Sequence, residues 1–487
     1  MQQRKRLNNM PLKLHNTLTR NLQEFVPQNS KEVLIYTCGP TVYNELHVGN
    51  WAAYIYWDIL VRVLAADEYN VKQVINITDV GHLTDDGDDG DDKLETGAKR
   101  ENSTAWNIAS KYTDSYIQGR EDLNILAPSK FAKATDYIPE QLELIKRLNE
   151  KGFIYQISDG LYFDTSKFPE YKNFAGLNLE AQQAGARVTY NSEKKNPSDF
   201  AVWKFSPTDK KRDMEWETPS YLVESSEKLM GFPGWHIECS AISLNELNET
   251  LDIHTGGIDH IPVHHTNEIA QSESATGKKF SNYWLHNNHM KSNGVKISKS
   301  LNNGYTLEDL RKKGFSSEDF RMFVLQSHYQ SESDFTFDNL KAASNRLNNW
   351  RNYAALRHQS YETISQQDNE LTFLPEPKIL LEILNNNLNT PKALSFIDEV
   401  FSKIDTSFKR IDRDSFCSFL ESIDQLLGLR LLETTPDIDE DSKRLILERR
   451  NARDEQDWRR ADEIRDELAK KSVAVNDTPK GSYWYYL

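Results

Sequence analysis

The chain has few cysteines and no long apolar run. Three cysteines among 487 residues do not make the disulfide framework of a small secreted protein, and the odd count suits a reducing compartment. No apolar run reaches the roughly 20 residues that a membrane-spanning helix needs. The basic segment 1–20 lacks the apolar centre of a signal peptide. We therefore expect a cytoplasmic protein with no membrane association.

An excess of basic residues is also lacking. The chain has 59 Lys and Arg against 74 Asp and Glu, a net charge of −15 at pH 7, which argues against a whole surface that coats nucleic acid and leaves room only for a local basic face. Hydrophobic residues make up 38% of the chain, which is enough for buried cores. The length predicts several domains.

The first clear pattern is strand, tight turn, helix and strand. Residues 33–36 form an apolar, β-rich run, 50–65 have a helical pattern, and 71–78 form a second strand. This is the βαβ unit of a parallel nucleotide-binding sheet, in which ligands bind at the carboxyl ends of the strands. Cys38 and Thr78 fall at two such ends.

Two further segments are suited to phosphate. A His-Val-Gly-Asn turn begins at His47, at the start of the predicted helix, where free backbone N–H groups favour anions. Lys296 and Lys299 lie on a loop that is bounded by Asn-Gly pairs, and paired ammonium groups suit the charge that develops on a leaving pyrophosphate. A lysine-serine loop alone is usually a solvated turn. Combined with the turn at His47, it predicts an ATP site.

Four residues that are distant in the sequence are candidate metal ligands. Cys38 and Cys239 lie beside the nucleotide-binding patterns, and His264 and Glu268 are spaced by four, so they would share one helical face. Zinc accepts sulfur, nitrogen and carboxylate ligands in tetrahedral geometry. An ordinary helical pair is the alternative for His264 and Glu268. The hypothesis is a split zinc site inside the ATP site.

Several motifs follow one another along the chain. They are Tyr-Thr-Cys-Gly-Pro-Thr-Val-Tyr at 36–43, His-Val-Gly-Asn at 47–50, Asn-Ile-Thr-Asp-Val at 76–80, Gly-Trp-His-Ile-Glu-Cys-Ser at 234–240, His-His-Thr-Asn-Glu at 264–268 and Lys-Ile-Ser-Lys-Ser at 296–300. With these motifs in this order and spacing, the chain resembles the cysteinyl-tRNA synthetase family of class I aminoacyl-tRNA synthetases over almost its whole length.

The resemblance implies an α/β fold with a Rossmann-type parallel-sheet catalytic domain that is split by an insertion. A helical bundle would follow, and helical patterns at 335–356 and 391–404 agree with it. A small C-terminal anticodon-binding domain would end the chain. The implied divisions are the catalytic halves 1–128 and 225–305, the connective insertion 129–224, a stem-contact region 306–340, the bundle 341–436 and the anticodon-binding domain 437–487.

The activity implied by the resemblance is that of a cysteine--tRNA ligase. L-Cysteine would attack the α-phosphate of ATP to give cysteinyl-adenylate, and the 3′-terminal adenosine of tRNA-Cys would then take the acyl group. One Zn²⁺, held by Cys38, Cys239, His264 and Glu268, would bind the substrate thiolate, and Mg²⁺ would accompany ATP. A metal–thiolate bond separates cysteine from serine better than ordinary contacts, which are worth ~1–3 kcal/mol.

The resemblance also assigns roles to other residues. His47 and Asn50 would stabilise the transition state at the phosphates, and Lys296 and Lys299 would neutralise the departing pyrophosphate. The implied ATP site comprises Gly39, His47, Gly49, Asn50, Lys296, Ser298 and Lys299, the cysteine pocket comprises Thr78, Trp235 and Asp259, with Asp259 near the substrate ammonium, and Asp477 would contact the anticodon.

Four features stand apart from these patterns. Residues 218–232 are longer than the family's connection, and Gln330 stands where the family commonly has arginine, so we expect one contact near the catalytic loop to be lost. The acidic run 85–92 does not have the spacing of an EF-hand loop, and we expect a solvated loop there. Cys417 has apolar neighbours and is expected to be a buried core thiol.

Other functions share parts of the pattern. A ligase that joins activated cysteine to an amino sugar would share the catalytic half but lack an anticodon-binding end. A non-catalytic tRNA-binding paralogue would have no need of intact His47, Lys296 and Lys299. A zinc hydrolase needs an open metal position that holds water. The synthetase interpretation accounts for all the motifs, and we expect a monomer.

Overall fold

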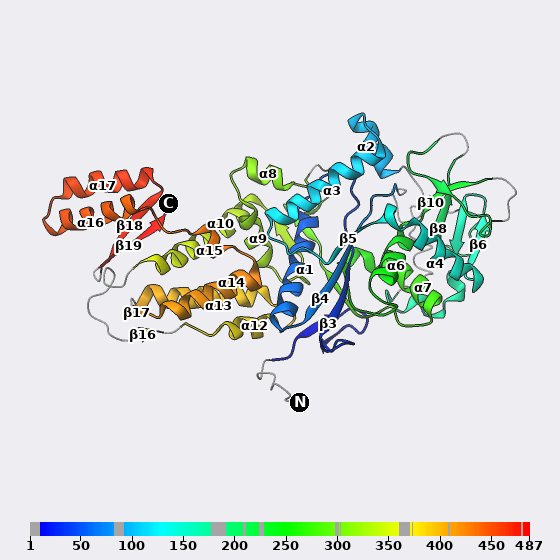
Figure 1. Ribbon diagram of the computed structural model, residues 1–487, viewed down its shortest axis with the longest axis horizontal. Helices are drawn as coiled ribbons and strands as arrows, with labels where there is room; N and C mark the ends of the chain where they lie inside the picture. The colour runs from blue at the N-terminus through cyan, green and yellow to red at the C-terminus, as the bar shows by residue number, and fades with distance from the viewer. Residues whose placement is uncertain are drawn as a thin grey trace.

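The chain forms an elongated molecule (Figure 1). The catalytic sheet and the insertion occupy one end, a helical bundle lies in the middle, and helices α16 (Glu440–Asp454) and α17 (Trp458–Lys470) lie at the other end. In the described part of the chain no helix has the length and apolar character needed to cross a bilayer. The computed structural model describes residues 10–81, 92–176, 191–207, 211–223, 228–297, 301, 303–359, 371–372, 374–407, 410–478 and 481–487.

Five parallel strands form the central sheet, in the order β12-β11-β3-β4-β5. The chain runs outward from β3 to β4 and β5, and later returns to the other side of β3 as β11. In such sheets ligands bind outside the carboxyl ends of the strands where the order reverses, here at β3 and β11. The strands are β3 (Glu32–Thr37), β4 (Asn70–Ile77), β5 (Lys130–Lys133), β11 (Leu251–Gly257) and β12 (Ser281–Asn287).

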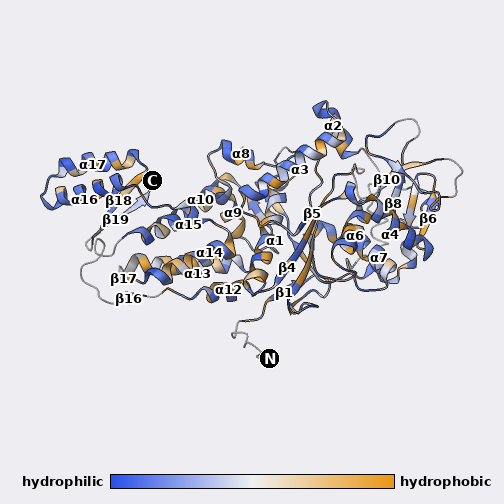
Figure 2. Cartoon of the chain, in the orientation of Figure 1, coloured by the Kyte–Doolittle hydropathy of each residue, from blue (hydrophilic) through white to orange (hydrophobic). Residues whose placement is uncertain are grey.

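Both faces of this sheet are covered, as is usual for parallel sheets. Val33 and Ile35 of β3 pack into a core with helix α1 (Val48–Ala66). Tyr36 of the same strand points the other way, into a second core with helices α4, α6 and α7. Figure 2 shows hydrophobic residues concentrated in the strands. The covering helices are α4 (Ile138–Glu150), α6 (Trp235–Glu246) and α7 (Thr266–Thr276).

A second, antiparallel sheet has the order β6-β7-β8-β10-β9, with four strands from the predicted insertion 129–224 and one, β10, that lies beyond its predicted end. The segment whose conformation the sequence left open connects β9 to β10, and these two strands pair with each other. Residues 224–227 of this connection and the acidic residues 85–91 lie outside the described part. The strands are β6 (Ile154–Ile157), β7 (Gly160–Phe163), β8 (Phe200–Phe205), β9 (Trp216–Glu217) and β10 (Met230–Pro233).

The second half of the chain is mainly helical, and both predicted bundle helices are confirmed as α10 and α13. Cys417 in α14 is only half-buried, so the prediction of a buried core thiol was wrong; the buried face of α14 is built from its neighbours Phe416 and Phe419. The bundle helices are α9 (Ser317–Leu325), α10 (Phe337–Ala355), α12 (Pro377–Leu384), α13 (Thr390–Ser407) and α14 (Arg413–Leu427).

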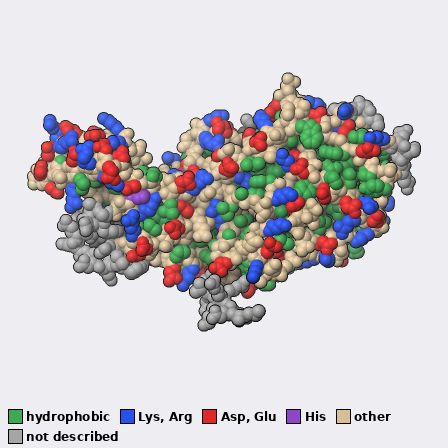
Figure 3. All heavy atoms as spheres, viewed as in Figure 1, with side chains coloured by type: hydrophobic (Ala, Val, Ile, Leu, Met, Phe, Trp, Pro, Cys, Tyr) green, Lys and Arg blue, Asp and Glu red, His purple; other side chains and the backbone are tan. Residues whose placement is uncertain are grey.

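The C-terminal end combines α16 and α17 with a hairpin of β18 (Val473–Thr478) and β19 (Gly481–Tyr486). Figure 3 shows acidic and basic side chains interspersed over this end. Many of them form ion pairs along the helices, such as Arg444 with Glu448. The arginines of this region are therefore balanced by carboxylates, as the overall negative charge of the chain requires.

Candidate active site

A cavity of about 910 Å³ opens at the carboxyl ends of β3 and β11, at the reversal of strand order. Glu268 lies behind its wall and is fully buried. Ser298 and Lys299 lie outside the described residues. The predicted site residues that line the cavity are Cys38, Gly39, His47, Gly49, Asn50, Thr78, Trp235, Cys239, Asp259, His264 and Lys296.

The first turn of α1 faces this cavity. His47 is the residue that caps the helix: its Nδ1 accepts from the backbone N–H of Asn50 at 3.3 Å, and the Asn50 side chain accepts from the backbone N–H of His47 at 3.2 Å. A neutral imidazole that accepts at Nδ1 carries its proton on Nε2. The cap therefore fixes a ring that can donate a hydrogen bond at the positive end of a helix.

Gly39 lies where β3 and β4 approach each other most closely. Its N–H donates to Asn76 Oδ1 at 2.7 Å, and a Cβ atom at this position would lie 1.6 Å from the backbone oxygen of Asn76. No side chain fits there unless the strand ends move apart. Such a movement would displace Cys38 and Thr78, which follow directly after the two strands.

Gly39→Ala is therefore expected to lower the melting temperature of the protein and to reduce its catalytic turnover by tenfold or more. The reason is that a displacement of about 1 Å in a group that positions a substrate can lower a reaction rate by roughly a hundredfold. Thermal unfolding and a turnover assay measure the two effects. Gly97→Ala in α2 (Lys93–Glu101) is the control, because its Cβ would meet no atom closer than 3.2 Å. Equal behaviour of the two variants would contradict the tight approach at Gly39.

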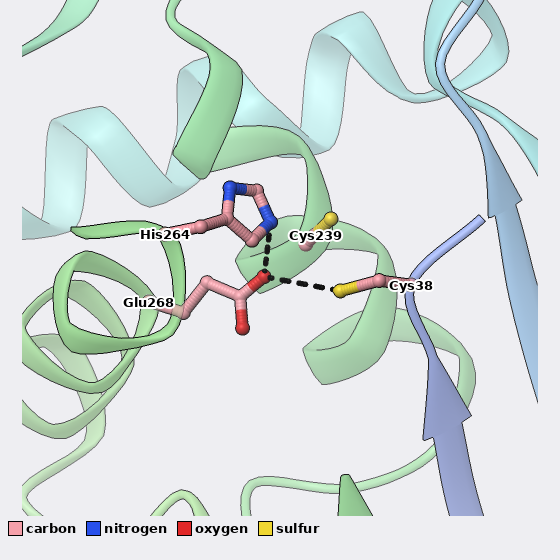
Figure 4. Close-up of side chains that lie close together, drawn as sticks. All are labelled: Cys38, Cys239, His264 and Glu268. Atoms are coloured by element: carbon pink, nitrogen blue, oxygen red, sulfur yellow. Dashed lines mark hydrogen bonds and ion pairs between the residues drawn. The ribbon is translucent and has the colours of Figure 1, made fainter. Parts of the chain in front are cut away.

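Four side chains converge at the floor of the cavity (Figure 4). Cys38 comes from the end of β3, Cys239 from α6, His264 from the π-turn η5 (Ile261–His265) and Glu268 from α7. One potential ligand atom of each lies within 4.8 Å of the others. His264 Nε2 and Glu268 Oε1 are 2.8 Å apart, as their spacing of four predicts.

The donor set fits a divalent zinc ion. Zinc takes sulfur, imidazole nitrogen and carboxylate oxygen at about 2.0–2.3 Å in tetrahedral geometry, and the four side chains offer two sulfurs, one nitrogen and one oxygen. Two thiolates and a carboxylate would also bring three negative charges into a buried site, which is unfavourable without a cation. These residues could therefore hold Zn²⁺ together.

The protonation of the cluster is governed by burial and by its own neighbours. Burial raises the pKa of Cys38, and the hydrogen bond with Cys38 together with burial raises that of Cys239. Burial opposes ionisation of Glu268, but His254 and His264 hold its pKa well below the ordinary value. Burial disfavours the His264 imidazolium, yet Glu268 raises the pKa of His264 to about 10. A bound cation would displace protons from both thiols.

Further histidines surround the four ligand candidates, and they were not predicted as part of the site. His254 Nε2 lies 2.7 Å from Glu268 Oε2, and His236 Nδ1 lies 2.9 Å from His264 Nδ1. His265 Nε2 lies 3.2 Å from Cys38 Sγ, and its Nδ1 lies 2.8 Å from His286 Nε2. Such contacts orient metal ligands. The available signal was the clustering of seven of the twelve histidines between residues 236 and 289.

Comparison with known proteins decides the family. Residues 24–345 match the model of the tRNA synthetases class I (C) catalytic domain, and residues 435–484 match that of the cysteinyl-tRNA ligase anticodon binding domain. Cysteine--tRNA ligase 1 of Burkholderia lata is 40% identical over 477 residues, which cover 97% of this chain and 96% of that protein. The chain belongs to the cysteine--tRNA ligase family.

Two further relatives agree with this membership, and a solved structure shares the fold. The cysteine--tRNA ligase of Treponema denticola is 38% identical over 505 residues, with 98% of this chain and 99% of that protein covered. The one of Zymomonas mobilis is 36% identical over 521 residues, with 97% and 98% covered. Methionyl-tRNA synthetase of Mycobacterium tuberculosis, solved with methionyl-adenylate, has the same fold: the TM-score is 0.54 at 14% identity, over 83% of this chain and 91% of that one.

In this family member, the residues predicted for the cysteine pocket lie around the ligand cluster. The Trp235 ring lies 4.6 Å from the ring of His264, measured between centroids. Thr78 Oγ1 donates to the buried Glu238 at 3.1 Å, and Asp259 lies just beyond the end of β11. All three line the cavity beside Cys38. Their role in binding the amino acid stays a prediction.

The start of the lysine loop lies against the turn at His47. Lys296 ends β14 (Val295–Lys296), is exposed and lines the cavity. The side chain of the next residue, Ile297, fills the space beside Gly49 and Gly304, where an added Cβ would meet it at 3.1 and 3.2 Å. The two phosphate-binding candidates therefore meet at one rim of the cavity.

Two other predicted features lie away from the cavity floor. Gln330 stands where the family commonly has arginine. Its side-chain oxygen accepts a hydrogen bond from Asn387 at 2.7 Å, and its backbone oxygen accepts one from Asn288 at 3.0 Å. Asn288 lines the cavity. Asp477 pairs with Arg449 at 2.7 Å and Arg453 at 3.0 Å at the far end of the molecule. An anticodon contact of Asp477 stays a prediction.

Proposed function

We propose that this chain is a cysteine--tRNA ligase that activates L-cysteine with ATP to cysteinyl-adenylate and transfers the acyl group to the 3′-terminal adenosine of tRNA-Cys. One observation carries the proposal. A single cavity is lined by the capped start of α1, which suits phosphate, and by three of the four candidate zinc ligands, Cys38, Cys239 and His264. A nucleotide and a thiol can therefore meet in one place.

Zn²⁺ would be held by Cys38, Cys239, His264 and Glu268, and when bound it would supply a soft Lewis acid that favours the thiolate of cysteine over the hydroxyl of serine. A second group of potential ligand atoms, from Cys38, His254, His265 and Glu268, is equally close together. Within that group only Cys38 lines the cavity. The first group is therefore the one that a substrate can reach.

Other residues of the cavity would bind the phosphates of ATP and the ammonium of cysteine. His47 would donate from Nε2 to the phosphate oxygens, and Asn50 would hold the helix start in place, with Mg²⁺ accompanying ATP. Lys296, and Lys299 beyond it, would neutralise pyrophosphate as it leaves. Asp259 would bind the ammonium of cysteine. In this arrangement the carboxylate of cysteine would lie beside the α-phosphate, which is the positioning that this reaction needs.

The alternatives account for less of the chain. A ligase for an amino sugar has no use for the segment 435–484 that matches an anticodon-binding domain. A hydrolase would need an open metal position that holds water, whereas here four protein ligands would fill a tetrahedral shell and the substrate thiolate would add as a fifth ligand only when bound. The proposed partners are tRNA-Cys, ATP and L-cysteine, and we expect the protein to act as a monomer.

Cysteine-dependent exchange between ATP and pyrophosphate tests the first step. Exchange is expected with cysteine and is expected to be at least a thousandfold weaker with serine, beyond the roughly 10–200-fold of ordinary pocket contacts. Removal of the metal with a chelator should abolish it, and added Zn²⁺ should restore it. Absence of exchange from a folded, zinc-loaded protein would overturn the proposal, and charging of tRNA-Cys then tests the second step.

A further inference from the structure

A buried carboxylate and two guanidinium groups lie where the catalytic domain meets the helical bundle. The side chain of Asp58, in α1, is fully buried. Its Oδ2 accepts from Arg62 Nε at 2.7 Å and from Arg321 of α9, and its Oδ1 accepts from the backbone N–H of Leu126 at 2.8 Å. Arg321 is also fully buried. One anion thus holds two cations from different parts of the chain.

The two guanidinium groups bind the carboxyl ends of two helices. In the last turn of α14, Arg62 donates to the backbone oxygen of Gln425 at 2.9 Å and Arg321 to that of Leu427 at 2.6 Å. Just after α3 (Ala105–Asp122), Arg62 donates to Asn124 at 2.6 Å and Arg321 to Leu123 at 2.9 Å. The last carbonyls of a helix lack partners and carry partial negative charge, so these contacts satisfy both helix ends.

The sequence around this cluster accommodates it. Burial opposes ionisation of Asp58, but Arg321 and Arg62 hold its pKa below the ordinary value, so the carboxylate is charged at neutral pH. Gly428 follows α14 directly, and a Cβ there would lie 2.6 Å from Arg321 Nη2. Glycine at the end of α14 therefore makes room for the guanidinium.

Helix α1 connects this cluster to the ATP site. It has 19 residues, and Asp58 lies 11 residues, or roughly 16 Å at 1.5 Å per residue, from the cap at His47. Figure 1 shows α1 between the central sheet and the bundle, and it contacts α9 and α14 of the bundle. The bundle in turn contacts the C-terminal hairpin through α10 and β19. A continuous series of packed elements therefore runs from the cavity to the C-terminal end.

We propose that Asp58 is a positioning residue that fixes the angle between the bundle and the catalytic domain, so that a tRNA held at the far end presents its acceptor end to the cavity. This rests on the proposed function. Two contacts on one ligand reinforce each other only when the geometry lets both form at once. If the angle at the joint, the contact between the catalytic domain and the bundle around Asp58, became variable, the anticodon contact should contribute less to charging of the tRNA. Activation of cysteine needs the cavity alone and should continue.

The test compares the wild-type protein with Asp58→Asn, which keeps the shape of the side chain and removes its charge. Three quantities are measured: cysteine-dependent pyrophosphate exchange, kcat/KM for charging tRNA-Cys, and kcat/KM for tRNA-Cys with a substituted anticodon. We expect the exchange rate of the variant to stay within about threefold of the wild-type rate. We define the ratio as kcat/KM for tRNA-Cys divided by kcat/KM for the tRNA with the substituted anticodon. We expect this ratio to fall by about tenfold or more in the variant, since it measures the benefit of simultaneous binding.

The ratio separates this role from a merely structural one. If Asp58 only stabilised the fold, charging of both tRNAs would fall by the same factor and the ratio would not change, and that result would overturn the proposal. Should Asp58→Asn fail to fold, Arg321→Lys replaces it, because lysine keeps the charge but cannot reach α14, Leu123 and Asp58 together. The same fall in the ratio is expected, and an unchanged ratio there also overturns the proposal.

A control removes a half-exposed carboxylate whose contacts stay within the bundle. Asp398 of α13 pairs with Arg346 and accepts from Trp350 Nε1 at 2.7 Å, both in α10. These contacts do not cross the joint, so Asp398→Asn is expected to leave the ratio at the wild-type value. Absence of exchange in the wild-type protein would instead contradict the proposed function, so the two failures are distinguishable.

Discussion

Replacement of Cys239 by serine is expected to remove both the bound zinc and the activation of cysteine. A hydroxyl does not ionise at neutral pH, and the buried cluster would lose one of its two thiolates. Changes to residues behind the ligands of metal sites typically cost 10–100-fold, and we expect loss of a ligand itself to cost roughly a thousandfold in exchange activity. Metal analysis of the purified protein and the exchange assay measure the two effects.

The control for this variant is Cys417→Ser. That thiol is half-buried in α14 and belongs to neither group of potential ligands among the described residues. It should keep one zinc per chain and full exchange. If Cys239→Ser also kept its zinc and its exchange activity, the assignment of Cys239 as a ligand would be wrong. That result would not contradict the proposed activation of cysteine.

Replacement of His47 by alanine is expected to lower the turnover of cysteine activation by roughly 10²–10³-fold, the cost of removing one donor that meets charge in a transition state. The KM for cysteine should change little, because the ring lies at the phosphate side of the cavity. Steady-state exchange kinetics at varied cysteine separate kcat from KM.

The structure supplies a control for the second role of His47, which is to cap α1. Loss of a cap costs about 1 kcal/mol of stability, and asparagine is a good capping residue. His47→Asn should therefore recover the melting temperature lost in His47→Ala but not the turnover. Recovery of turnover by asparagine would show that the cap, and not the imidazole, is what the reaction requires.

Local patterns were sufficient to predict the core of the fold. The strands predicted at 33–36 and 71–78 are found as β3 and β4, because both segments are rich in valine and isoleucine, which favour strands and can be read from the sequence. The connection 218–232 could not be predicted, since the pairing of β9 with β10 depends on a partner strand and not on local preference.

The site was predictable only in part. Cys38, Cys239, His264 and Glu268 have the donor chemistry of a zinc site, and this can be recognised in a sequence. The contacts of His254 with Glu268 and of His236 with His264 cannot be recognised in a sequence. A histidine that orients a metal ligand has the same sequence signature as one that packs in a core. The cluster of Asp58, Arg62 and Arg321 was missed for a similar reason: the contacts of Arg321 with Asp58 and of Arg62 with Gln425 join residues that are hundreds of positions apart.

The wide separation of the four ligand candidates has a consequence for biogenesis. Cys38 and Glu268 are 230 positions apart in the sequence, so at about 5–20 residues per second a ribosome needs roughly 10–50 s between making the first and the last of them. The cluster cannot close before β11, η5 and α7 have been made. Acquisition of zinc would therefore come after translation of more than half the chain, and a metal shortage at that stage should leave the four side chains without the cation that their charges require.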